Sequence, residues 1–234
     1  SLAKELGMKV FSLRHQIGFK TQSLDEALSN AVASTDTPVI VADQSDNPGG
    51  GAPSDSTFAL RWILDHKITN VAMAIIYDPE VVRLAKAGGV GAHLNVRLGG
   101  KMGPTSGDPV DVSVVVLGVI ENHSNYFLQE NSDPIIMPLG DTVALRAGGI
   151  DMIVSSQRGQ CVNPKIFADF NIDLMEKSLV MVKSTNHFLK AFSPISSNVI
   201  YMAALGTVNP NIQDFPYQRM TTEDKYPWNE SPHC

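Results

Sequence analysis

The stretch PVIVADQSDNPGGGAPSDSTFALRWILDH, residues 38–66, predicts a buried strand, a glycine turn and a helix in one run. Residues 38–42 are continuously apolar, which is typical of a strand inside a parallel sheet, and residues 58–66 are helix-like. Three consecutive glycines, Gly49, Gly50 and Gly51, let the backbone adopt positive φ and come close to a ligand. Asp55, Ser56 and Thr57 can cap the helix that follows. A strand, a glycine turn and a helix N-terminus together predict a site for an anion or a polar substrate group.

Strands and helices alternate on both sides of this stretch. The sequence predicts helices over residues 23–33 and 79–88, and a strand rich in Val, Ala and Ile over residues 70–77. Proline at position 79 falls in the first turn of its helix, where proline is well tolerated. This order of strands and helices favours a parallel sheet with right-handed crossovers.

The pattern changes at about residue 93. Residues 93–98, 110–120 and 142–155 alternate or run apolar between Gly, Pro, Asn and Asp, which predicts an antiparallel β layer. Further on, the sequence predicts a short helix, a strand, another helix and a last strand, at residues 164–170, 179–183, 188–192 and 198–204. We therefore expect an α/β fold: a mixed sheet with parallel βαβ units and an inserted antiparallel β layer over about residues 93–156.

Composition argues against several classes of protein. The 234 residues carry a formal net charge of −6 without a run of Lys and Arg, so nucleic-acid binding is not expected. No apolar stretch reaches membrane-spanning length. Cys161 and Cys234 lie far apart, which is typical of reduced thiols in the cytoplasm rather than of a disulfide framework. The chain starts at Ser1 without a Met or a signal peptide, and we therefore expect it to be the C-terminal part of a larger protein.

Two acidic residues after the first predicted strand are candidates for chemistry. Asp43 and Asp46 fall at the strand end, where open α/β sheets place their ligands. Asp46 could act as a general base or hold a substrate amine. It could equally close an Asx-turn before Pro48.

Other candidates follow later in the chain. His187 comes after the strand predicted at residues 179–183 and could donate a proton or stabilise an oxyanion, or only pack beneath a loop. Lys183 and Ser184 could hold a substrate carboxylate, although Lys183 equally suits an ion pair at a strand end. Lys101 could bind a carboxylate or a phosphate, or be a solvated turn residue. Cys161 has no His or Asp at a recognised spacing, so a nucleophile role is not expected.

Several motifs in order resemble the C-terminal region of microcystinase-C-like (MlrC-type) metallopeptidases. They are DNPGGGAPSDST (46–57), DPE (78–80) with AGGVGA (87–92), LGGK (98–101), VKSTNHF (182–188) and FPYQR (215–219). The resemblance covers residues 1–217, which we expect to be one domain, and leaves residues 218–234 as a polar tail. Ser54 stands where the family pattern suggests glycine.

The resemblance implies a zinc-dependent hydrolase of amide bonds in small peptides, with the zinc bound mainly by an N-terminal domain that this chain lacks. The chain itself has no HExxH and no clustered Cys and His, so it does not contain a complete metal site, and we assign no metal ligand to it. Its expected partners are that N-terminal domain and a small peptide or amide substrate, and a homo-oligomer is left open. The alternative is a non-catalytic α/β module that holds a small anionic ligand at the glycine loop. The expected catalytic residues are Asp46 and His187, and the expected substrate-binding residues are Asp43, Asn47, Gly49, Gly50, Gly51, Asp55, Lys101, Lys183 and Ser184.

Overall fold

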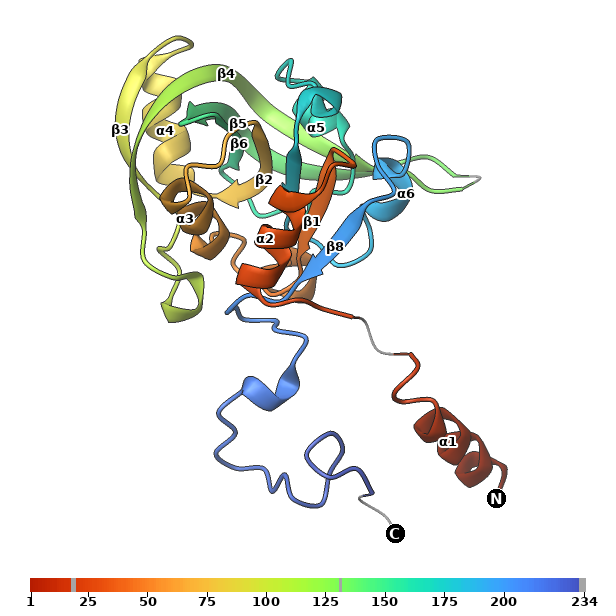
Figure 1. Ribbon diagram of the computed structural model, residues 1–234. Helices are drawn as coiled ribbons and strands as arrows, with labels where there is room; N and C mark the ends of the chain where they lie inside the picture. The colour runs from red at the N-terminus through yellow and green to blue at the C-terminus, as the bar shows by residue number, and fades with distance from the viewer. Residues whose placement is uncertain (18–19, 131, 232–234) are drawn as a thin grey trace.

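The computed structural model describes residues 1–17, 20–130 and 132–231. Within these residues one eight-stranded sheet has the strand order β3-β4-β5-β6-β2-β7-β1-β8 (Figure 1). The half β6-β2-β7-β1-β8 is parallel, and the half β3-β4-β5-β6 is antiparallel. The strands are β1 (Val39–Asp43), β2 (Val71–Tyr77), β3 (His93–Leu98), β4 (Val110–Phe127), β5 (Ile135–Ala147), β6 (Ile150–Ser155), β7 (Leu179–Val182) and β8 (Val199–Met202).

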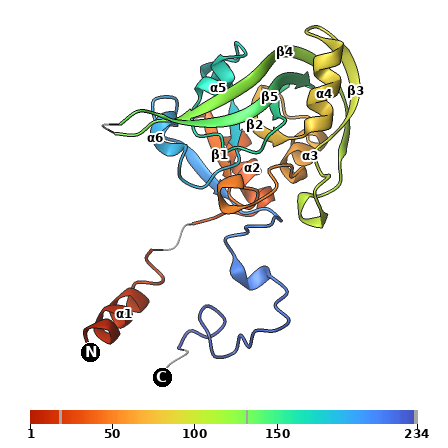
Figure 2. The same ribbon diagram turned by 180° about the vertical axis from the view of Figure 1, so that it is seen from behind.

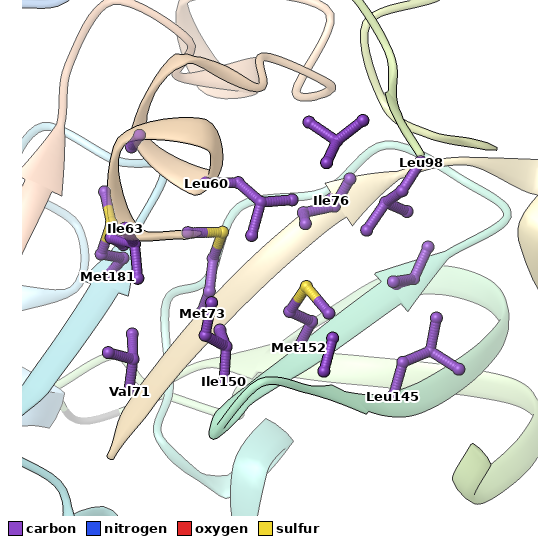
Figure 3. Close-up of a cluster of buried hydrophobic side chains, with 14 of the residues drawn as sticks. Leu60, Ile63, Val71, Met73, Ile76, Leu98, Leu145, Ile150, Met152 and Met181 are labelled. Atoms are coloured by element: carbon purple, nitrogen blue, oxygen red, sulfur yellow. The ribbon is translucent and has the colours of Figure 1, made fainter. Parts of the chain in front are cut away.

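Helices cover both faces of this sheet. Side chains of β1 alternate between two buried clusters, because successive residues of a strand point to opposite faces. One cluster packs against α2, α3 and α4, and Figure 3 shows its part around Leu60 and Ile63 of α3. The other packs against α5 and α6. The α-helices are α1 (Leu2–Ser12), α2 (Leu24–Ala33), α3 (Phe58–Asp65), α4 (Pro79–Gly88), α5 (Lys165–Ala168) and α6 (Leu189–Phe192).

Local signals explain where most of these elements begin. Ser23 forms a capping box at the start of α2, and Asp78 caps α4 by accepting the N–H of Val81. Of the three residues predicted to cap α3, Thr57 is its N-cap residue, but it makes no side-chain cap bond. Asp55 bonds elsewhere, because its carboxylate accepts hydrogen bonds from the loop that follows β3.

The predicted mixed α/β fold is confirmed, and the antiparallel strands extend the same sheet as the parallel ones. Residues 142–155 are not one strand: a turn at Gly148 and Gly149, both with positive φ, separates the end of β5 from β6. β4 is longer than predicted and continues to Phe127. It therefore runs from the β3 edge of the sheet across to α6 (Figure 1).

The N-terminal helix and the C-terminal segment lie apart from the sheet and its helices in both views (Figures 1 and 2). α1 buries none of its residues. The two segments meet each other, since the ring of Phe11 lies 5.8 Å edge-on from Tyr226 and Arg14 pairs with Glu230 at 3.5 Å. The domain boundary at residue 217 stays a prediction. No helix among the described residues is long and apolar enough to cross a membrane.

Candidate functional site

The carboxyl ends of the parallel strands gather polar side chains at one edge of the sheet. Asp43 ends β1, Asp78 follows β2, and Lys183 follows β7. β7 pairs with both β1 and β2, so these ends lie side by side. This is the edge at which open α/β sheets place their ligands.

Asp46 and Lys183 form a buried ion pair at this edge. Lys183 Nζ lies 2.7 Å from Asp46 Oδ2 and also donates to the carbonyl oxygen of Ser56 at 3.1 Å. The backbone N–H groups of Ser54 and Ser56 donate to the two carboxylate oxygens of Asp46 at 2.8 and 2.7 Å. The side chains of Lys183 and Asp46 are only 6% and 2% exposed. Both oxygens of Asp46 are therefore engaged within the chain, and they hold residues 54–56 against the end of β7.

Two carboxylates keep Lys183 charged. Burial alone would lower the pKa of Lys183, but Asp46 and Asp43 outweigh it and raise that pKa above its ordinary value. Burial raises the pKa of Asp43; Lys183, 3.6 Å away, opposes this rise, and repulsion from Asp46 adds to it. Asp46 is thus the principal counter-ion of the lysine, and Asp43 is the secondary one.

The glycine loop contains a 3₁₀ turn, Pro48–Gly50, that Asn47 holds in place. Asn47 Oδ1 accepts the N–H of Gly49 at 2.9 Å, and the Asn47 carbonyl accepts that of Gly50 at 3.0 Å. The N–H of Gly51 donates to the carbonyl of Pro48 at 3.0 Å. In this conformation the three glycine N–H groups that an anion would need are bonded within the loop.

The three glycines differ in what they require. Gly51 alone has a positive φ, of +96°. A Cβ on Gly49 would lie 2.4 Å from the side-chain amide of Gln160, whereas one on Gly50 would meet only a side chain at 3.3 Å. Ser54 has a φ of +65°, a region that favours glycine. This conformation accounts for the glycine that the family pattern suggests at position 54.

Asp55 and Lys101 belong to a second cluster, beside the start of α4. Asp55 Oδ2 accepts the N–H groups of Lys101 and Met102 at 2.7 and 2.9 Å. Lys101 Nζ lies 2.5 Å from Asp78 Oδ2. These residues line a cavity of about 200 Å³. Lys101 is therefore already paired with a carboxylate of its own chain, away from His187.

Gln160 connects the glycine loop to His187. His187 Nδ1 lies 2.9 Å from Gln160 Oε1, so in the neutral imidazole this nitrogen carries the proton and Nε2 is an acceptor. Gln160 Nε2 donates to Asn47 Oδ1 at 2.6 Å and to Ser184 Oγ at 3.4 Å. His187 Nε2 has no hydrogen-bond partner among the described residues. Sequence reasoning missed Gln160, because it lies in a loop after β6 and belongs to none of the motifs.

An apolar cavity of about 380 Å³ opens beside His187. The ring of His187 forms part of its wall and packs against Phe127, with the ring centroids 5.3 Å apart. We call this space the α6 cavity. It is lined by Phe127, Leu128, Val162, Asn186, His187, Lys190, Ala191 and Pro194.

The described residues do not form a metal site on their own. Nowhere among them do three His, Cys, Asp or Glu side chains come together in an arrangement that could hold a metal ion. Asp46 and Asp55, the acidic residues nearest the glycine loop, bond instead to Lys183 and to backbone N–H groups. The donor set that structural or catalytic zinc needs is thus not supplied by this part of the chain.

These features define an open α/β domain whose candidate site lies at the carboxyl ends of its parallel strands. Residues 41–219 match the family described as MlrC C-terminus, and the chain belongs to that family. It is 37% identical over 174 residues to Microcystinase C from Sphingomonas sp., an alignment that covers 74% of this chain and 33% of that protein. A solved structure of a candidate metallopeptidase from Mesorhizobium sp. BNC1 matches with a TM-score of 0.79 and 22% identity.

That structural match covers 96% of this chain and 44% of the Mesorhizobium chain. At this level of identity the match shows a shared fold. The chain spans about a third of the length of Microcystinase C and under half of the solved relative.

Proposed function

We propose that this chain is the part of a zinc-dependent peptide hydrolase that completes an active-site cleft, with the zinc bound mainly by an N-terminal domain. The family match carries the proposal, because residues 41–219 include the glycine loop, Lys183 and His187. The description of the Mesorhizobium relative as a metallopeptidase supports the reaction class. The proposed substrate is a small peptide or amide. A cytoplasmic location rests on the cysteine pattern alone.

His187 is the proposed catalytic residue of this chain. Gln160 fixes its tautomer and ring orientation through the bond to Nδ1, and Nε2 stays available. Nε2 can accept a hydrogen bond from a substrate N–H or take up a proton during hydrolysis. The side chain is exposed at the mouth of the α6 cavity, so a substrate can reach it.

Asp46 serves in this proposal as a positioning residue. Its three hydrogen bonds hold Lys183 to residues 54–56, the segment that follows the glycine loop in the chain. Asn47 and Ser184 act through Gln160. The substrate-binding roles expected of Asp43, Gly49, Gly50, Gly51, Asp55, Lys101 and Lys183 stay predictions; the glycine N–H groups and the two lysines are paired within the chain.

The test uses the full-length gene product that contains this chain. Short linear peptides should be hydrolysed, hydrolysis should stop with a chelator, and added zinc should restore it. His187→Gln should lower kcat/KM by about 100-fold or more, the usual contribution of a proton-transfer group. His93→Gln, at an exposed position on the far edge of the sheet, is the matched control and should leave kcat/KM unchanged.

Full activity of folded His187→Gln would overturn the catalytic role of His187. A full-length protein without any chelator-sensitive hydrolysis would overturn the reaction class. Tight binding of a small anion that weakens on substitution in the glycine loop would then favour the binding module instead. No observation in the structure favours that second function, since the glycine N–H groups are paired.

A further inference from the structure

We propose that the α6 cavity is a specificity subsite that takes one large, uncharged apolar side chain of the peptide substrate. This inference rests on the proposed function and adds the substrate class to it. Most of the lining side chains are apolar, and the volume of about 380 Å³ falls within the range of small-ligand sites. Burial of a large apolar side chain there should favour its binding by about 10- to 100-fold, enough to rank substrates.

The cavity is already formed, because several of its lining elements are held in place by buried or paired neighbours. α6 is anchored by Phe188 and Phe192, which are fully buried and pack edge-to-face at 5.9 Å. Val162 is buried as well. Phe127 is fixed by its pairing with Ile135 of β5. A side chain that enters therefore needs little rearrangement of the protein, which favours binding.

Charge at the rim selects an uncharged occupant. The ammonium group of Lys190 is bonded to the carboxylate of Glu130, and both side chains are largely exposed. The rim therefore carries no net charge from this pair. None of the described residues that line the cavity is acidic, so a cationic side chain would find no carboxylate partner among them. An apolar side chain avoids the cost of burying an unpaired charge.

The mouth of the cavity has the polar groups that a peptide backbone would need. His187 Nε2 is an acceptor there, and Asn186 stands next to it on the exposed surface. His187 also joins the cavity to the glycine loop through Gln160 and Asn47. A single substrate residue could thus place its side chain in the cavity and its amide at His187. A protein partner would need a far larger surface, of about 800 Å² on each side.

The first experiment measures kcat/KM of the full-length protein with peptides that differ at one position, carrying Phe, Leu, Ala or Asp. Peptides with Phe or Leu should be preferred over those with Ala by about 10-fold or more, and Asp should be worst. Ala191→Phe, which fills the cavity from α6, should remove this preference, so that the variant hydrolyses the Phe, Leu and Ala peptides with kcat/KM values within about 3-fold of one another. Leu128→Trp fills it from the exposed strand end and provides a second variant if Ala191→Phe does not fold.

A second experiment does not depend on hydrolysis. Saturation-transfer NMR should detect N-acetyl-phenylalanine amide on the wild-type protein more strongly than N-acetyl-alanine amide, and Ala191→Phe should abolish this difference. Binding without any peptide hydrolysis would keep the subsite and overturn the proposed function. Unchanged substrate ranking in both folded variants would overturn the subsite. The subsite would also be overturned if filling the cavity changed only the oligomeric state of the protein or the contact of this domain with the rest of the full-length chain.

Discussion

Removal of the Asp46 carboxylate should strongly destabilise this fold, because it would leave Lys183 buried without its principal counter-ion. Three hydrogen bonds at 2.7–2.8 Å end on this carboxylate. Removing one partner of a buried pair costs about 3–5 kcal/mol. Asp43 remains 3.6 Å from the lysine nitrogen, so we expect the lower end of that range for Asp46→Ala, about 3 kcal/mol. A chain of this size should then melt about 6–12 °C lower.

The assay is urea unfolding of the chain followed by circular dichroism at about pH 7. Asp46→Asn should be nearly as unstable as Asp46→Ala, because an amide places a donor where the surrounding groups all donate. The double variant Asp46→Leu/Lys183→Met should be more stable than the sum of its single variants predicts, since it removes both charges. Stability of Asp46→Asn within about 0.5 kcal/mol of wild type, or strict additivity in the double variant, would refute the reasoning.

Three further perturbations test other parts of the structure. Gly49→Ala should push away the Gln160 amide and lower kcat/KM of the full-length protein at least 10-fold. Gly50→Ala is the control and should keep kcat/KM within about two-fold of wild type. Equal effects of the two substitutions would contradict the close approach of Gln160 at Gly49. Burial works against ionisation of Asp151, but two bonded basic side chains outweigh it and hold its pKa below the ordinary 3.8. The stability that ionised Asp151 gives the fold is therefore present above pH 3.8 and is lost as the pH falls through the folded pKa. The melting temperatures of Asp151→Asn and wild type should converge below about pH 3.8. A gap between them that stays constant with pH would be contrary evidence. Burial raises the pKa of the Cys161 thiol, and mass spectrometry should find that residue unmodified by a thiol reagent until denaturant is added; rapid labelling of folded protein would show that it is accessible.

Local patterns were sufficient to predict most elements of the sheet. Residues 39–42 of β1 and all of β7 are buried on both faces, so these stretches are continuously apolar and could be recognised without knowledge of their neighbours. The helices predicted over residues 23–33 and 79–88 begin beside Ser23 and Asp78, which cap them through bonds made within three residues. The pairing of β6 with β2 could not be predicted in this way, because it depends on strands that are far apart in the chain.

The candidate site was predicted in part. The positions of Asp46, Lys183 and His187 after parallel strands indicated a common edge, which the sheet topology explains. The Asp46–Lys183 bond joins residues 137 positions apart, and Gln160 joins Asn47 across 113, so neither partner could be inferred from spacing. The close approach at Gly49 depends on that same distant glutamine.

The long hairpin formed by β4 and β5 lets two properties change independently: the pairing of the sheet and the lining of the α6 cavity. Its root is fixed in the sheet by pairing with β3 and β6, while its outer end, at Phe127 and Leu128, borders the α6 cavity. Adding or removing two residues near that end would keep the side-chain alternation of both strands and the register of the root. With the subsite proposed above, substrate preference could diverge through hairpin length alone, while the buried sheet and the Asp46–Lys183 pair are inherited unchanged.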